Sequence, residues 1–176
     1  KENVVAVKVD NRKQPNSRWY SGSGIYRHVW LIVTDKLHIE PWGVFVTTPE
    51  VSNELASVKI QTTVANEHDK SADCTVLTTI LNDKDQIVKT VSSKKRVKGN
   101  SSKEFTQTVE IDDPRLWSVD KPNLYKAHVA VKSGRKAVDS YQTNFGIREF
   151  RFDPQKGFFL NGKHVKIKGV CLHHAC

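Results

Sequence analysis

The chain has 176 residues, of which 38% are hydrophobic and 27% are charged, a composition typical of globular proteins and unlike that of disordered chains. A chain of this length buries roughly 70% of its unfolded surface, which suits one good core with appendages better than two full domains. Its longest apolar run is a few residues, far short of the ~20 that cross a bilayer, so we expect no membrane-spanning helix and no membrane partner.

The balance of 28 Lys and Arg against 19 Asp and Glu gives a net charge of +9. The basic residues are spread along the chain, with one concentration at Lys94, Lys95, Arg96 and Lys98. Short charged runs beside turn residues usually form the solvated flank of a hairpin. Nucleic-acid binding is a rival reading, which a steep fall of affinity with salt would reveal, but no nucleic-acid motif accompanies the charge. We therefore expect no nucleic-acid partner.

The three cysteines, Cys74, Cys171 and Cys176, are odd in number and lack the close paired spacing of a zinc site. They predict free thiols, no metal site and no cofactor. Residues 1–7 lack the apolar stretch of a signal peptide, so the signal of an exported parent would lie upstream of this chain.

The first part of the chain mixes predicted strands with a loop. Alternating valines predict a strand over residues 4–9, and residues 25–33 and 37–46 have the same β character. Between them, residues 11–24 collect Pro, Gly, Asn and Ser around Trp19-Tyr20, which predicts a loop with embedded aromatic side chains.

Residues 44–147 carry the pattern of an all-β sandwich: short runs rich in Val, Ile, Thr and Tyr, separated by polar turns about ten residues apart. Residues 58–64 alternate between apolar and polar, and residues 74–81 predict a central strand. Further strands are predicted at residues 86–91, 105–111, 124–131 and 137–145, about seven in all. The predicted core comprises Val58, Ile60, Val64, Ile80, Phe105, Val109, Trp117, Tyr125, Val129 and Val131.

After Gly146 the pattern changes to two small hairpin-like pieces, with turns at residues 153–157 and 161–163. Residues 165–168 and 169–172 predict strands that lead directly into His173-His174. Because the chain stops immediately after an apolar strand, we expect it to be a piece of a longer polypeptide.

Three segments together resemble the family 2 glycoside hydrolases, the group of β-galactosidases, β-mannosidases and β-glucuronidases. The first, NSRWYSGSGIYR at residues 16–27, is similar to the end of that family's sugar-binding jelly roll. The second, DPRLWS with KPNLY at residues 113–118 and 121–125, is similar to a segment pair of its immunoglobulin-like domain. The third, FGIR at residues 145–148, FFLNGK at 158–163 and IKGV at 167–170, is similar to the lead-in to its catalytic (β/α)8 barrel.

The resemblance implies an immunoglobulin-like β-sandwich with truncated flanking segments. Residues 1–43 would be the last strands of a jelly roll, residues 44–147 the whole sandwich, and residues 148–176 the lead-in and first strand of the barrel. The parent would be a retaining β-galactosidase acting on a β-linked saccharide, with the rest of the parent chain as partner. A bacterial periplasmic or secreted parent is the favoured expectation for location, which the sequence leaves open.

Retaining glycosidases use two carboxylates about 5 Å apart, as acid/base and as nucleophile. In the resembling family both are Glu residues on later barrel strands, so no catalytic residue is expected on this chain, which would be inactive alone. The family's acid/base Glu follows an Asn; Asn53-Glu54 and Asn66-Glu67 match that pair but fall inside the sandwich, and we assign them no catalytic role.

The predicted substrate-binding residues are Asn16, Arg18, His173 and His174. The two histidines would follow a barrel strand at the active-site mouth, although paired histidines near a chain end are also ordinary surface groups. Family members often carry an acidic residue just after this pair, where the present chain has Ala175-Cys176. Trp19 and Tyr20 could stack on sugar rings, but such aromatics are more often packing anchors.

A rival from another class is an autonomous carbohydrate-binding or adhesion sandwich. The linker reading requires catalytic sequence downstream of Cys176, whereas the rival requires a stop codon there. Apolar residues in both flanking segments predict either disorder of the terminal segments or self-association of this chain. Self-association is favoured, because exposed strand edges and large apolar patches recruit partners.

Overall fold

The computed structural model describes residues 3–10 and 24–171, and it divides the chain into two units, Lys1–Val33 and Thr34–Cys176. The described residues of the first unit contain no strand, so the strands predicted over residues 4–9 and 25–33 are wrong there. Their apolar side chains are exposed, Val5 and Leu31 by about nine-tenths. The physical reason is that alternation favours a strand only where a neighbouring strand satisfies its backbone groups. No described helix is long and apolar enough to span a bilayer.

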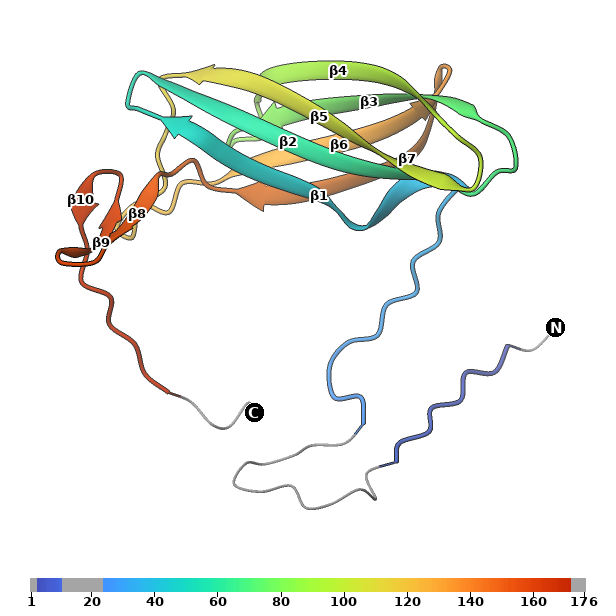
Figure 1. The fold of residues 1–176 in the computed structure, drawn as a ribbon, viewed down its shortest axis with the longest axis horizontal. Helices are drawn as coiled ribbons and strands as arrows, with labels where there is room; N and C mark the ends of the chain where they lie inside the picture. Colours follow the sequence, from blue (N-terminus) through green and yellow to red (C-terminus); the bar gives the residue numbers. More distant parts are fainter. Residues whose placement is uncertain (1–2, 11–23, 172–176) are drawn as a thin grey trace. The chain divides into compact units, whose positions relative to one another are not determined.

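The second unit is an all-β sandwich of antiparallel strands, as the sequence predicts (Figure 1). One sheet has the order β1-β2-β5 and the other has the order β4-β3-β6-β7. Their strands are β1 (Leu37–Val51), β2 (Leu55–Asn66), β3 (Ala72–Leu81), β4 (Ile87–Val97), β5 (Ser101–Asp112), β6 (Tyr125–Ser133) and β7 (Lys136–Phe145).

The fourth strand distinguishes this sandwich from a constant-type immunoglobulin domain. In that arrangement the fourth strand joins the sheet of the first, second and fifth. Here β4 pairs with β3 over the register Ala72↔Val97 to Leu81↔Ile87, and the chain changes sheets between β4 and β5. The four-stranded sheet therefore ends in β4 on one side and β7 on the other.

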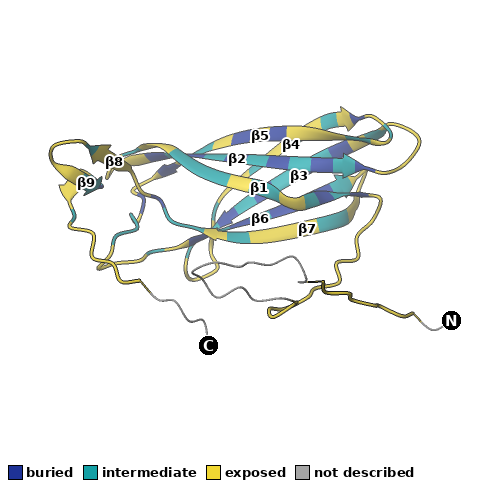
Figure 2. Cartoon of the chain, turned by 60° about the horizontal axis from the view of Figure 1, so that its bottom comes forward, coloured by how far each residue is buried: buried dark blue, intermediate teal, exposed yellow. Residues whose placement is uncertain are grey.

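The core lies between the two sheets, where every second residue of β2 and β3 is buried (Figure 2). This alternation confirms the prediction that residues 58–64 form a strand with one buried and one solvent-exposed face. The predicted central strand at residues 74–81 is β3, which lies between β4 and β6. Eight predicted core residues are buried: Val58, Ile60, Val64, Ile80, Phe105, Tyr125, Val129 and Val131. Val109 is partly buried against the core. Trp117 is only half-buried, so its prediction as a core residue is wrong: it lies beyond the strands, at the end of the sandwich.

Polar groups join the two sheets across the core. The Gln107 side chain of β5 accepts a 2.6 Å hydrogen bond from the Thr78 hydroxyl and donates to the Val76 carbonyl oxygen at 3.0 Å and to the Ser93 hydroxyl at 3.0 Å. Because the buried amide is fully partnered, it stabilises one register between the sheets without leaving an unsatisfied group.

Lys94, Lys95 and Arg96 of the basic run lie on the edge strand β4, which extends past the predicted end at residue 91 to Val97, and Lys98 follows it. Two lysines close the side of the sandwich where β4 faces β5. Lys95 Nζ donates to the Glu104 carbonyl oxygen at 2.9 Å, and Lys103 Nζ donates to the Arg96 carbonyl oxygen at 3.1 Å. Charged side chains on an edge strand also oppose pairing with another chain.

A small three-stranded sheet follows the sandwich, in the order β10-β9-β8. Its strands are β8 (Phe150–Asp153), β9 (Gly157–Leu160) and β10 (Lys163–His164). The two predicted hairpin-like pieces are therefore present, but the last strand begins within the predicted turn at residues 161–163 and ends at His164. Asp153 Oδ1 accepts from the backbone N–H groups of Gln155 and Lys156, both at 2.9 Å. The strands predicted at residues 165–168 and at 169–172, as far as residue 171, are absent. The Val165 N–H still donates to the Phe158 carbonyl oxygen of β9 at 2.9 Å, but no described strand pairs with residues 166–171.

Candidate functional site

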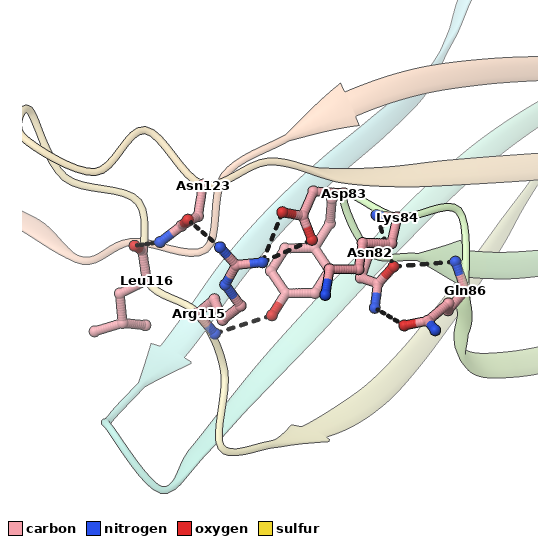
Figure 3. A network of polar contacts seen from close by, with 8 residues as sticks. Asn82, Asp83, Lys84, Gln86, Arg115, Leu116 and Asn123 are labelled. Carbon is pink, nitrogen blue, oxygen red and sulfur yellow. Dashed lines mark hydrogen bonds and ion pairs between the residues drawn. The ribbon is translucent and has the colours of Figure 1, made fainter.

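The segment DPRLWS is held to the end of the sandwich by Arg115 (Figure 3). Arg115 Nη1 lies 2.6 and 2.7 Å from the two carboxylate oxygens of Asp83, and Nη2 donates to Asn123 Oδ1 at 3.0 Å. Asn123 in turn donates to the Leu116 carbonyl oxygen at 2.9 Å, and the Arg115 N–H donates to the Tyr125 hydroxyl at 2.9 Å. The hydrogen bond from Arg115 holds the pKa of Asp83 below its ordinary value. Arg115, Asn123 and Tyr125, which belong to the second pair of family-like segments, therefore have a structural role.

This network presents Trp117 at the junction between the sandwich and the β8–β10 sheet. The backbone N–H of Trp117 donates to the carbonyl oxygen of buried Ile147 at 2.8 Å. The Arg148 guanidinium lies 4.6 Å from the centre of the Trp117 indole ring. A Cβ on Gly146 would lie 2.8 Å from the Cβ and Cγ of Trp117. Only glycine permits the backbone to approach the indole this closely.

Asn161, in the β9–β10 turn, fixes the small sheet to this junction. Its Nδ2 donates to the Trp117 carbonyl oxygen at 2.9 Å, and its Oδ1 accepts from the Glu149 N–H at 3.0 Å. The Asn161 N–H donates to the Glu149 carbonyl oxygen at 2.9 Å. Asn161 has φ +48°, a left-handed conformation that Asn adopts more readily than most residues. The Thr48 hydroxyl adds a 2.9 Å bond from β1 to the Arg148 carbonyl oxygen.

The junction encloses an open, mainly apolar hollow of about 670 Å³. Phe152 and Phe158 contact each other with ring centres 5.1 Å apart, and Phe150 lies 6.2 and 6.4 Å from those two rings. The wall residues are Trp117, Val119, Arg148, Phe150, Phe152, Phe158, Leu160, Val165, Lys166, Ile167 and Lys168. A second hollow of about 700 Å³ lies between β1 and the junction and includes Glu149.

The described walls of the two hollows hold few acidic residues. The described wall of the first hollow contains no Asp or Glu, and the described wall of the second contains one acidic residue, Glu149. A retaining glycosidase needs two carboxylates. Burial raises the pKa of the Cys74 thiol to about 11, which leaves it protonated and unreactive at neutral pH. Within residues 3–10 and 24–171, no group of three or more His, Cys, Asp or Glu side chains could hold a metal ion.

All four predicted substrate-binding residues, Asn16, Arg18, His173 and His174, lie outside the described residues. The structure therefore leaves that prediction untested. The residues that organise the junction are Gly146, Arg148 and Asn161, and the sequence marks them only as parts of family-like segments or of a turn. The segments FGIR and FFLNGK are the signal that points to them, but nothing local in the sequence shows that Asn161 bonds to a residue 44 positions away.

Comparison with known proteins bears on the whole chain. The family model described as glycosyl hydrolases family 2 matches residues 37–148. The β-galactosidase BoGH2A of Bacteroides ovatus is 42% identical over 172 residues, which cover 98% of this chain and 20% of that protein. A putative β-glucuronidase of Formosa agariphila is 35% identical over 172 residues, covering 98% of this chain and 16% of that protein.

Solved structures agree with this relationship. A family 2 member from Bacteroides cellulosilyticus superposes with a TM-score of 0.86 at 36% identity, covering 93% of this chain and 22% of that one. A Bacteroides uniformis β-glucuronidase gives a TM-score of 0.83 at 30% identity, covering 94% and 21%. The chain thus spans about a fifth of the length of its relatives. On sequence and fold together, it belongs to family 2 of the glycosyl hydrolases.

Proposed function

We propose that this chain is the non-catalytic immunoglobulin-like linker region of a retaining family 2 glycosidase of the β-galactosidase type. The observation that carries the proposal is the junction at Trp117 and Asn161. There the sandwich holds a small sheet with an exposed aromatic face, through hydrogen bonds of 2.8 to 3.0 Å. Such a junction can set the orientation of a catalytic domain that follows in the chain, without taking part in chemistry.

The proposed domain limits follow the same logic. Residues 1–36 would belong to a preceding sugar-binding jelly roll, residues 37–147 to the sandwich and residues 148–176 to the entry of a catalytic barrel. The limit predicted at residue 43 moves to residue 36, because β1 (Leu37–Val51) pairs with β2 in the sandwich. The β8–β10 sheet lies in the last segment, and its aromatic side chains would pack against that barrel. Asn16, Arg18, His173 and His174 would contact the β-linked saccharide at the edge of the active site.

The preference for galactosides rests on the named relatives. The Bacteroides ovatus β-galactosidase shares 42% identity with this chain, compared with 35% for the putative β-glucuronidase of Formosa agariphila. We infer a galactoside as substrate of the longer enzyme. A β-glucuronide is the alternative that the same assay tests.

The experiment has two parts. The purified 176-residue chain should not hydrolyse nitrophenyl β-galactoside, since a covalent two-step mechanism requires both carboxylates. The polypeptide encoded by the gene read past Cys176 should hydrolyse it faster than nitrophenyl β-glucuronide. Turnover by the pure chain, free of host enzyme, would contradict the linker role, and a stop codon directly after Cys176 would favour an autonomous carbohydrate-binding sandwich.

In the longer enzyme, His173→Ala and His174→Ala should each lower kcat/KM if those side chains contact the sugar in the transition state. The matched control is His164→Ala, which changes an exposed histidine of β10. An equal loss in all three variants would contradict a substrate-binding role for the His173-His174 pair.

A further inference from the structure

The outer face of the four-stranded sheet carries basic side chains that take no part in the contacts between β4 and β5. From Ile87 to Lys103 the sequence has six Lys or Arg residues and no Asp or Glu. Lys95 and Lys103 are engaged in the contacts between β4 and β5, and Lys89 lies 3.4 Å from Asp112. Lys94 and Arg96 point instead to the outer face, with 67% and 73% of their side chains exposed.

Strand register brings a third cation beside them. Thr75 of β3 lies directly opposite Lys94 of β4 on one side and opposite Lys132 of β6 on the other. Directly opposed residues of antiparallel strands share a face, so Lys94, Thr75 and Lys132 form one row across the sheet. With strands ~4.8 Å apart, the backbones of the two lysines are about 10 Å apart, and Arg96 is about 7 Å from Lys94 along β4.

Little negative charge offsets this triad of Lys94, Arg96 and Lys132. Asp73 lies 3.8 Å from both Lys94 Nζ and Arg96 Nε, so one carboxylate serves two cations, and both contacts are long. Lys132 has no carboxylate within ion-pair distance in the described structure. The turn after β6 adds Arg135, which is exposed. The face therefore keeps a net positive charge that a ligand can neutralise.

The spacing and surroundings of the triad favour one class of anion. Duplex DNA carries one charge per ~1.7 Å of its axis, far denser than cations 7 to 10 Å apart. The outward residues of these strands include no Phe, Tyr or Trp on which bases could stack. They supply hydroxyl groups and an apolar side chain instead, at Thr75, Ser92 and Leu77. Sugar rings present both hydroxyl groups and apolar faces.

We propose that the outer face around Lys94, Arg96 and Lys132 is an accessory binding surface for acidic polysaccharides, chains with widely spaced carboxylate or sulfate groups. The choice of a saccharide over another polyanion rests on the function proposed above. The basic surface would hold an acidic glycan near the longer enzyme while hydrolysis proceeds elsewhere.

The test measures binding of the 176-residue chain to polygalacturonate at low salt, with unsubstituted dextran and duplex DNA as comparison polymers. The triple variant Lys94→Thr, Arg96→Thr, Lys132→Thr keeps strand propensity and should weaken polygalacturonate binding about tenfold or more. The matched control Lys121→Thr, Lys156→Thr, Lys163→Thr removes three exposed charges elsewhere and should change it less than about twofold. Asp73→Asn should tighten binding, whereas Asp120→Asn should not.

Equal weakening in the two triple variants would overturn the proposal in favour of diffuse charge. Tighter binding of DNA than of polygalacturonate would overturn the choice of ligand. The absence of polygalacturonate binding would overturn both the binding surface and the choice of ligand. Hydrolysis of a nitrophenyl glycoside by the longer enzyme is read separately. Activity without glycan binding contradicts only this inference, and glycan binding without activity contradicts only the proposed function.

Discussion

The side chain of Asn161 donates a 2.9 Å hydrogen bond to the carbonyl oxygen of Trp117, and this bond joins the β9–β10 turn to the end of the sandwich. The same side chain accepts from the Glu149 N–H at 3.0 Å. One turn residue therefore connects three stretches of chain: its own turn, the segment at Trp117 and the segment at Glu149.

Replacing Asn161 should loosen the β8–β10 sheet without unfolding the sandwich. Asn161→Ala loses both side-chain bonds and places Ala at positive φ, for an expected local cost of roughly 1–3 kcal/mol. Amide hydrogen exchange should show faster opening across β8 and β9 and unchanged rates in β2 and β3. Asn100→Ala, at another Asn with positive φ, controls for backbone strain. Equal protection of β8 and β9 in both variants would contradict the role given to Asn161.

The close approach of Gly146 to the indole ring gives a second prediction. Gly146→Ala should destabilise by about 1–3 kcal/mol, because its Cβ would meet Trp117 atoms at 2.8 Å. Trp117→Ala should cost about 2 kcal/mol, less than for a core tryptophan, since the ring is only half-buried. In the double variant the two costs should be less than additive, because most of the ring that the new Cβ meets is gone. Gly146→Ala should still cost some stability there, because the Trp117 Cβ remains.

Urea unfolding measures these differences. The matched control is Gly169→Ala, because a Cβ there meets nothing within 4 Å, and its effect should stay within about 0.5 kcal/mol. Strict additivity of Gly146→Ala and Trp117→Ala would show that the two positions do not interact.

The ion pair between Arg115 and Asp83 predicts an acid-sensitive step. Since the hydrogen bond from Arg115 lowers the pKa of Asp83 in the folded state, its contribution is fully present above the unfolded pKa of about 3.9. It is lost as the pH falls through the lower folded pKa. Asp83→Asn should therefore lower Tm at neutral pH, and its difference from the wild type should shrink below pH ~4. Asp120→Asn is the control. A constant Tm difference between wild type and Asp83→Asn at all pH values would contradict this assignment.

The sequence predicts the sandwich well because its signal is local. Alternation at Val58, Ile60 and Val64 matches the pleat of β2, and all three side chains are buried. Trp117 shows the limit of the same reasoning. An aromatic residue after a Pro-x-Leu turn looks like core, but its position depends on Arg148 and Asn161, which are distant in sequence.

The flanking segments show a second limit. Val5 and Leu31 have the spacing and residue type of strands, yet they are exposed and belong to no strand, because pairing depends on neighbours that periodicity does not specify. The candidate substrate residues share this property. A histidine pair after an apolar run predicts an active site only through the family resemblance, since the sequence does not show which groups surround the two side chains.

The apolar wall of the junction predicts self-association of the isolated chain. Phe150, Phe152 and Ile167 are 59%, 69% and 66% exposed and line the same hollow. Contiguous apolar surface of this kind recruits partners, and a second copy is the partner available in a pure solution. Light scattering over a concentration series should show a rising mean mass, which Phe152→Ser with Ile167→Ser should reduce. Ile87→Ser, at an exposed apolar residue of β4, should leave it unchanged. A strictly monomeric wild type at every concentration would contradict this prediction.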